Sequence, residues 1–244
     1  MSYYDYNPRR TPDGMATPPW LGAQIDAGLR AYMQRVYSYM AGGLAVTGIV
    51  AFAAAASGFY QAIAGTPLIW IVMLAPLGFV LALSFGIQRM SAGTTMMLFW
   101  IYAAVMGLSL GGIFLVYTGT SIARVFFITG ATYGAMSLYG YTTRSDLSGF
   151  GSFLIMGLIG IVIASLVNIF VGSSALQFVI SVIGVLVFVG LTAYDTQRIK
   201  EMYLESDSAE IADRKAVMGA LALYLDFINL FMLLLQLFGQ RRDN

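Results

Sequence analysis

Two aspartates lie inside stretches that otherwise read as lipid-spanning helices, and their type and position point to chemistry. Asp195 ends the run GLTAYD, and Asp226 lies within the run ALYLDFINLF. A charged side chain near the centre of a bilayer costs roughly 2.5–3.5 kcal/mol, so such acids are candidates for a functional site. A structural interpretation stays open for each. Asp195 is near enough to the end of its run to reach the interface, and Asp226 could be held by hydrogen bonds to neighbouring helices.

The composition of the chain is that of a membrane protein. Hydrophobic residues make up 59 % of the sequence and charged residues 10 %, against about 25 % charged residues in soluble domains. The net charge of +1 argues against nucleic acid as a partner, because phosphate recognition needs a concentrated basic face. The chain has no cysteine and no histidine. Disulfides, thiolate chemistry, the commonest metal ligand and the usual general base are therefore all excluded.

Seven apolar runs follow one another along the chain, each close to the ~20 residues that cross ~30 Å of hydrocarbon. They are continuous rather than alternating, which favours helices over a barrel. The sequence thus predicts an all-α membrane protein, a seven-transmembrane helix bundle in one domain over residues 21–244. A mobile tail is expected over 1–20 and an interfacial lead-in helix over 21–35. The predicted spans are 36–57, 68–87, 95–116, 121–142, 152–171, 176–196 and 217–238.

The distribution of lysine and arginine predicts the orientation of the bundle. Basic residues near the ends of the spans gather on the side that holds the N-terminus, and cytoplasmic loops carry such an excess. We therefore expect the N-terminus in the cytoplasm and the C-terminus outside. The residues on the predicted cytoplasmic side are Arg30, Arg35, Arg89, Arg144, Arg198, Lys200, Arg214 and Lys215, and those on the other side are Arg124, Arg241 and Arg242.

The last predicted span carries a polar stripe. At 100° per residue, Gly219, Asp226, Asn229 and Gln236 fall within one sector of about 100°. A helix with such a stripe is expected at the centre of the bundle, and Asn229 and Gln236 become candidate polar residues of a pathway. Asp226 lies about 13 Å from the cytoplasmic end of its helix at ~1.5 Å per residue, so both acids are predicted in the same half of the membrane.

The two acids could perform three kinds of chemistry if they face each other in a dry bundle. They could not both ionise cheaply, so they would share a proton and titrate as a coupled pair, which makes a proton sensor. When both are ionised, Asp195 and Asp226 would form a doubly negative oxygen site suited to Ca²⁺, with Asn229 or carbonyl oxygens as further ligands. Two aspartates sharing a proton could also activate water for peptide hydrolysis.

Three stretches of the sequence resemble the Bax inhibitor-1 family, also called the transmembrane Bax-inhibitor-motif family. They are AYDTQ at 193–197, LDFINLF at 225–231, and the lead-in formed by RVY at 35–37 and LAVTG at 44–48. The resemblance implies seven transmembrane helices with the C-terminal helix enclosed by the other six, and a pH-dependent calcium leak. It also implies that Asp195 and Asp226 form the pH-sensing pair.

Further features implied by this resemblance concern an arginine and a partner. Arg89 stands where the family has an arginine that pairs with the acid of the sixth helix in a closed state. An acid present in the second helix of some members is missing from residues 68–87. Bacterial relatives resemble modulators of a membrane-bound AAA protease, and the acidic connection after the sixth span and the tail are where such a partner would dock.

An enzymatic interpretation has weaker support. Tyr194-Asp195 is similar to the tyrosine-aspartate motif of presenilin-type intramembrane proteases, but no Gly-x-Gly-Asp accompanies Asp226, and the triplet Ala75-Pro76-Leu77 is on the wrong helix. We therefore expect no enzyme and no resident cofactor, with a calcium ion as the only candidate ligand. The expected protein is a multi-pass inner-membrane protein of bacterial type. Its expected function is passive passage of Ca²⁺ through the lipid bilayer, gated by protons.

Overall fold

The computed structural model describes the backbone of residues 19–63, 65–86 and 90–242 and the side chains of this range except 19–26 and 81–86. In the part described, every predicted run overlaps one long helix. The helices are α1 (Pro19–Ala56), α2 (Phe59–Ile63), α3 (Leu68–Gly86), α4 (Ala92–Leu110), α5 (Ile113–Val116), α6 (Gly119–Thr142), α7 (Ser148–Val171), α8 (Ser174–Glu201) and α9 (Ala209–Phe238).

Five helical segments are long and apolar enough to cross a membrane. They are Ala27–Ala56, Ala92–Val116, Ser148–Val171, Ser174–Glu201 and Ala209–Phe238. Helix α3 is apolar over the shorter segment Leu68–Val80, and α6 contains many Gly, Ser, Thr and Tyr residues together with Arg124. The helical class of the prediction is therefore confirmed, whereas the count of seven spans stays a prediction.

The element boundaries differ most from the sequence prediction at α1 and α9. The expected lead-in segment and first span form one uninterrupted helix of 38 residues, α1. At ~1.5 Å per residue this helix is about 57 Å long, well beyond the ~30 Å of a hydrocarbon core. The expected long connection before the last span is short, because α9 already begins at Ala209, where the hydroxyl of Ser208 accepts a hydrogen bond from the amide of Ile211. Residues 1–18 of the predicted tail lie outside the described residues.

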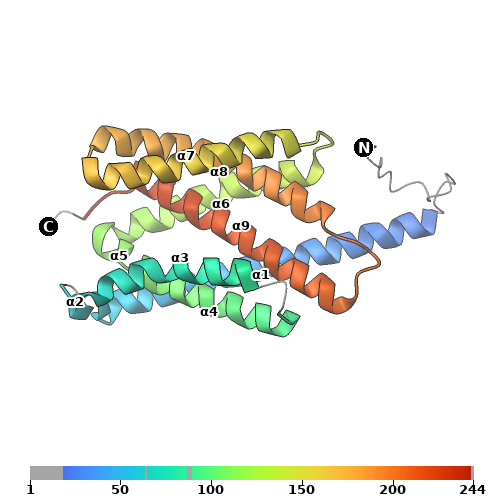
Figure 1. Cartoon of the computed structure of the whole chain (residues 1–244), viewed down its shortest axis with the longest axis horizontal. Coiled ribbons are helices and arrows are strands. Elements are labelled where there is room, and N and C mark those ends of the chain that lie inside the picture. Colours follow the sequence, from blue (N-terminus) through green and yellow to red (C-terminus); the bar gives the residue numbers. More distant parts are fainter. Residues whose placement is uncertain (1–18, 64, 87–89, 243–244) are drawn as a thin grey trace.

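Helix α9 lies between a group formed by α1, α3 and α4 and a group formed by α6, α7 and α8 (Figure 1). It packs against α1 and α4 of one group and against α6 and α8 of the other. Within the groups, α4 packs between α1 and α3, and α8 packs between α6 and α7. The helix predicted to be central therefore packs against both groups.

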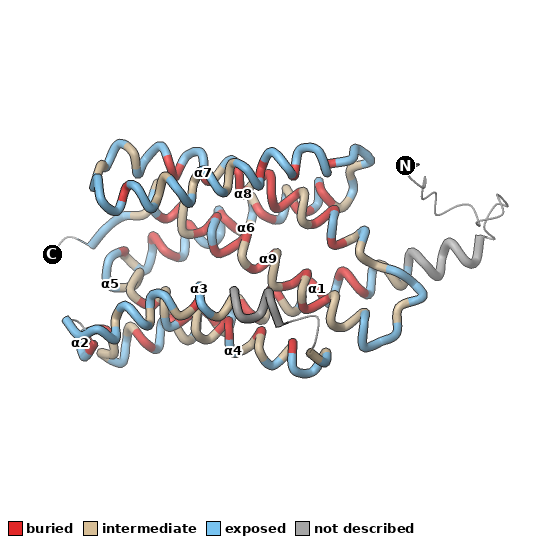
Figure 2. The backbone as a smooth tube through the Cα atoms, viewed as in Figure 1, coloured by how far each residue is buried: buried red, intermediate tan, exposed pale blue. Residues whose placement is uncertain are grey.

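The outer surface of the bundle is apolar, and Figure 2 shows the outer helices largely exposed around a buried centre. Large apolar side chains such as Trp70, Phe127, Ile169 and Phe170 are 65–90 % exposed. Exposed apolar surface of this extent marks contact with lipid or protein rather than with water. By contrast, Leu223, Tyr224, Leu230 and Leu235 of α9 are fully buried.

An aromatic cluster joins α9 to α1 and α4. The ring of Tyr224 meets those of Phe99 and Tyr102 edge to face, with centroids 6.0 and 5.8 Å apart. The Thr47 hydroxyl donates to the carbonyl oxygen of Ala103 at 2.8 Å and lies 2.7 Å from the Tyr224 hydroxyl. Since the single Thr47 proton is used on Ala103, the tyrosine is the donor to Thr47. The hydroxyls of Thr47 and Tyr224 are thereby both satisfied.

Candidate functional site

The structure brings the two predicted acids together where α8 meets α9. Asp226 is 5 % exposed, and Asp195 is partly buried. Their carboxyl groups lie close enough to interact directly. This juxtaposition follows from the close packing of α8 and α9. Each acid therefore has the other as its neighbour in a largely apolar interface.

Glycines in the neighbouring helices hold the Asp195 segment in place. A Cβ atom on Gly140 of α6 would overlap the carbonyl oxygen of Ala193, and one on Gly151 of α7 would overlap the ring of Tyr194. On α9, a Cβ on Gly219 would come within 2.9 Å of Ile199 Cγ2. Small residues let helices approach closely where lipid supplies no hydrophobic drive between them. The position of Asp195 is thus fixed from three sides.

The hydrogen bonding of the pair is incomplete when both carboxyl groups are ionised. In the part of the chain that the structure describes, Asp226 Oδ2 is buried and receives no hydrogen bond. A buried polar atom without a partner costs about 1–3 kcal/mol, and more if it is charged. A proton held between the two carboxyl groups would turn one of them into a donor. The pair therefore has the composition of a site that binds one proton.

Few charged or titratable groups face this pair. Arg198, one turn beyond Asp195 on α8, attracts that carboxylate electrostatically. Tyr133 of α6 lies within electrostatic range of both acids, and its hydroxyl also interacts electrostatically with Tyr37 of α1. Among the described residues, Arg198 is therefore the cation that most directly balances the pair.

A row of hydroxyl groups runs beside the pair from α1 to α8. The Tyr37 hydroxyl lies 2.5 Å from Ser137 Oγ, which lies 3.0 Å from Thr196 Oγ1. Thr196 donates to the carbonyl oxygen of Thr192 at 2.7 Å. These bonds connect α1, α6 and α8 next to Asp195.

A small cavity of about 170 Å³ opens at Asp195. Its lining combines the charged ends of Asp195 and Arg198 with apolar side chains of α8 and α9. The other lining residues are Ile199, Met202, Met218, Gly219 and Ala222. Asp195 is therefore the acid of the pair that has space beside it, whereas Asp226 lies behind it in the core.

Other predicted site residues are not brought to the pair. Arg89 lies outside the described residues. Asn229 is exposed, and its amide donates to the carbonyl oxygen of Leu225 in its own helix at 2.8 Å. Gln236 is exposed near the C-terminal end of α9, where its Oε1 accepts hydrogen bonds from Gln177 and Ser181 of α8. Of the predicted polar stripe of α9, Gly219 and Asp226 are thus buried, whereas Asn229 and Gln236 are exposed.

Sequence reasoning missed Arg198 and Tyr133. Arg198 stands three residues after Asp195, a spacing that places two side chains on one face of a helix, so that signal was present. Tyr133 had no such signal, because tyrosine is common in apolar helices. Among the described residues no group of three or more acidic, histidine or cysteine side chains could hold a metal ion. A calcium ion at the pair would need most of its six to eight oxygen ligands from elsewhere.

The apolar surface and the long apolar helices together define a helical membrane protein, with a pair of carboxyl groups between two of its helices. Residues 29–243 match the sequence profile described as "Inhibitor of apoptosis-promoting Bax1". The chain belongs to this family, the Bax inhibitor-1 family.

Bacterial relatives match this chain over nearly its whole length. The inner membrane protein YbhL of Escherichia coli strain K12 is 51 % identical over 223 residues, 90 % of this chain and 95 % of YbhL. Protein RP147 of Rickettsia prowazekii is 50 % identical over 90 % of this chain and 93 % of its own length. The membrane protein SpyM3_0260 of Streptococcus pyogenes is 35 % identical, covering 89 % and 96 %.

Proposed function

We propose that this protein is a passive cation leak, with Ca²⁺ as the physiological ion, gated by a proton shared between Asp195 and Asp226. The observation that carries the proposal is the contact between two carboxyl groups in a buried interface, with one oxygen of Asp226 lacking a donor. Proton binding satisfies that oxygen and holds α8 against α9. Loss of the proton leaves two negatively charged carboxylates next to each other.

The charge change is large enough to move helices. Two unit charges about 4 Å apart repel each other by about 4 kcal/mol at an effective dielectric constant of 20. This exceeds the 1.4 kcal/mol that changes a conformational equilibrium tenfold. Separation of α8 from α9 relieves the repulsion, and it exposes a doubly negative oxygen site to a cation. Arg198 opposes the separation, because its charge stabilises an ionised Asp195 without any movement.

The cavity beside Asp195 gives the proposed route for protons and ions. It places Asp195 next to the end of the bundle that carries Arg35 and the connection between α8 and α9. We assign this end to the cytoplasm and the whole bundle to the inner membrane, because basic residues gather there and YbhL is named an inner membrane protein. The acids would then respond to cytoplasmic pH.

Calcium flux into proteoliposomes that contain only this protein tests the proposal. Flux is measured from pH 5 to 8, with the membrane potential clamped and the calcium gradient varied separately. The wild type should show a pH-dependent leak. Asp226→Asn supplies a permanent amide donor, so its flux should lose its pH dependence, and Asp195→Asn should behave alike. Asp146→Asn is the matched control, because Asp146 is an exposed acid between α6 and α7 and should leave the profile unchanged.

Two outcomes would contradict the proposal. If the single variants and the double variant all keep the wild-type pH profile, the pair does not gate. If the wild-type protein conducts no cation at any pH, the leak itself is wrong. The second outcome would favour a non-conducting role, such as regulation of a membrane-bound AAA protease through the α8–α9 connection.

A further inference from the structure

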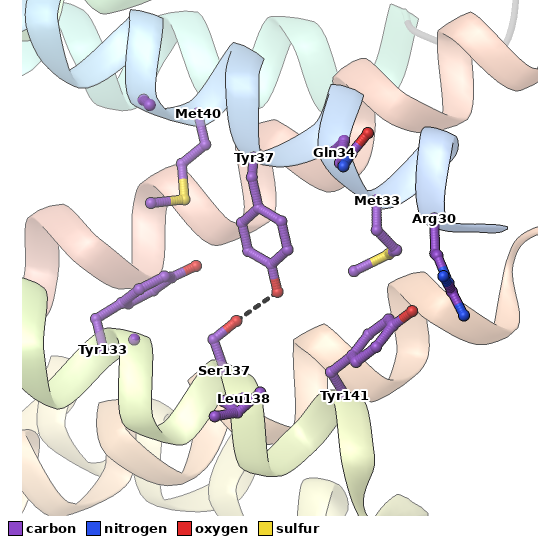
Figure 3. Close-up of a pocket in the computed structure, with 11 residues that line it drawn as sticks. Arg30, Met33, Gln34, Tyr37, Met40, Tyr133, Ser137, Leu138 and Tyr141 are labelled. Carbon is purple, nitrogen blue, oxygen red and sulfur yellow. Dashed lines mark hydrogen bonds between the residues drawn. The ribbon is translucent and has the colours of Figure 1, made fainter. Parts of the chain in front are cut away.

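A groove runs along the outside of the bundle between α1 and α6. Its widest part is a cavity of about 530 Å³, and the described residues that line it all belong to these two helices (Figure 3). A second cavity of about 430 Å³ shares Ala41 with the first, and a third of about 90 Å³ shares Leu44, Gly48 and Phe126 with the second. In the described part of the chain, α1 and α6 do not pack closely against each other. We call these three neighbouring cavities together the α1–α6 groove.

Glycines keep the groove open. A Cβ atom on Gly134 of α6 or on Gly48 of α1 would meet nothing within 4 Å. The walls between them are apolar, with Met40, Ala41 and Leu44 on the α1 side. The wide part alone falls within the range of about 300–1,000 Å³ typical of pockets for small ligands. The groove therefore has the length and lining of a site for an extended apolar chain.

Two polar features make the groove more than an apolar gap. Tyr133 is only 4 % exposed, and its buried hydroxyl has no hydrogen-bond partner among the described residues. In Figure 3 it is directed into the space between the two helices, across from Tyr37. Buried hydroxyls are nearly always satisfied, so an orphan donor that lines a cavity indicates a missing acceptor.

The second polar feature is a cation at the mouth of the groove. Arg30 lines the wide cavity and is exposed. In the part of the chain that the structure describes, the ion pairs are Arg35 with Asp213 and Lys215 with Asp207, and Arg30 takes part in neither. Gln34, one turn further on, adds an amide donor to the same wall. The mouth thus offers a positive charge and a hydrogen-bond donor.

From these features we infer that the α1–α6 groove binds one molecule of anionic phospholipid, with its phosphate at Arg30 and an acyl chain along the groove. The orphan Tyr133 hydroxyl donates to an ester carbonyl oxygen. Tyr37, across from Tyr133, is seven residues from Arg30, about 10 Å along α1. The arginine side chain and the glycerol backbone span that separation. The acyl chain then follows Ala41, Leu44 and Gly48 toward Phe126.

Charge and polarity select this occupant over the alternatives. A second copy of the protein would need an apolar ridge complementary to the groove and would leave Arg30 and Tyr133 unsatisfied. Free phosphate would not fill an apolar path that extends over Arg30–Gly48, about 27 Å. A zwitterionic lipid would bring its own cation next to Arg30. An anionic lipid satisfies the charge, the orphan donor and the apolar path together.

Photo-cross-linking tests the inference. The full-length protein is reconstituted in phosphatidylcholine vesicles containing a small fraction of phosphatidylglycerol with a photoreactive acyl chain, and cross-linked peptides are mapped by mass spectrometry. Cross-links should concentrate on the groove faces of α1 and α6. Excess unlabelled phosphatidylglycerol should compete, whereas phosphatidylcholine and inorganic phosphate should not.

Matched variants show whether the groove itself is responsible. Gly134→Leu blocks the path and should lower cross-linking there about tenfold, the change expected from a loss of about 1.4 kcal/mol. Gly160→Leu is the control, because Gly160 is an equally open glycine on the exposed face of α7. Arg30→Gln should reduce the preference for phosphatidylglycerol about fivefold, from about 1 kcal/mol per basic residue near a lipid surface. Arg124→Gln, an exposed arginine at the opposite end of α6, should not.

Three results would overturn the inference. The first is cross-linking spread over α3 and α7 in proportion to their exposure. The second is equal labelling by the anionic and zwitterionic probes. The third is Gly134→Leu labelling at the wild-type level. If Gly134→Leu fails to fold, judged by gel filtration and circular dichroism, Ala41→Phe obstructs the same path from α1 and is measured instead.

Discussion

Replacing Gly140 by alanine should show how tightly the Asp195 segment is clamped between helices. A Cβ atom on Gly140 would overlap Ala193 O and would lie 2.8 Å from Ala193 C and 2.9 Å from Ala193 Cα. Carbon atoms prefer separations of about 3.5–4.0 Å, so α6 and α8 would have to move apart locally by about 1 Å. All three atoms belong to the backbone of α8. No side-chain rotation can relieve the overlap.

The matched control removes the effect of helix propensity. Gly130 is on the same helix, and a Cβ atom there meets nothing within 4 Å. Gly130→Ala should be neutral or stabilising by about 0.4–1 kcal/mol. The difference between the two variants isolates the clash, which for overpacking in a close-packed interior is about 1–3 kcal/mol. At about 2–4 °C per kcal/mol for a chain of this size, Gly140→Ala should melt about 2–12 °C below Gly130→Ala.

Thermal unfolding in detergent, followed by tryptophan fluorescence at one scan rate, measures this difference. Trp100 is a suitable reporter because it packs against Phe99 in the core, with ring centroids 5.4 Å apart. A Gly140→Ala protein that melts with or above Gly130→Ala would refute the close contact between α6 and α8. The proposed rigidity of the Asp195 segment would then have no structural basis.

Three further predictions follow from the structure. Thr47→Val should destabilise the protein by about 1–3 kcal/mol in thermal unfolding, because the buried Tyr224 hydroxyl loses its acceptor, whereas Thr47→Ser should restore most of the loss. The side chain and the amide of Ser148 hydrogen-bond to Asp146 and lower the pKa of that carboxyl. The stabilisation that the ionised Asp146 gives to the folded protein is therefore present at neutral pH, and it is lost as the pH falls below about 4. The melting difference between wild type and Asp146→Asn should therefore stay constant from pH 7 to 5 and shrink below pH 4. A topology reporter fused after Asn244 should report the outside and one in the α8–α9 connection the cytoplasm; cytoplasmic signals from both would mean that α9 does not cross.

Much of the fold could be predicted, because apolar runs determine where helices lie. The last predicted span starts at 217, whereas α9 starts at Ala209. The reason is that the apolar pattern ends where the membrane ends, whereas the helix extends further into polar residues. Its first residue is determined by a capping residue, which for α9 is Ser208. The same reason explains why α8 continues to Glu201, beyond the predicted end at 196. Helix length beyond the bilayer is therefore hidden from an apolar pattern.

The acids of the site could be predicted for the same reason that the helices could. Asp195 and Asp226 stand out because almost no other charge interrupts the apolar runs. The sequence prediction placed Asn229 on the same face of the last helix as Asp226, because it treated a sector of about 100° around the helix axis as a single face. Asn229 is rotated about 60° from Asp226, and Gln236 about 80°. Helix α9 has neighbours on two sides only, so a rotation of this size is enough to move a side chain from the interface to the exposed face.

The row of hydroxyls from Tyr37 to Thr192 has one further consequence. Each hydroxyl carries a single proton, and Thr196 gives its own to the main-chain oxygen of Thr192. Thr196 must then accept from Ser137, and Ser137 must accept from Tyr37. All the O–H bonds therefore point the same way, toward an oxygen that cannot pass a proton on. The row therefore braces three helices with hydrogen bonds of one fixed direction, and it cannot relay a proton beyond the main-chain oxygen of Thr192.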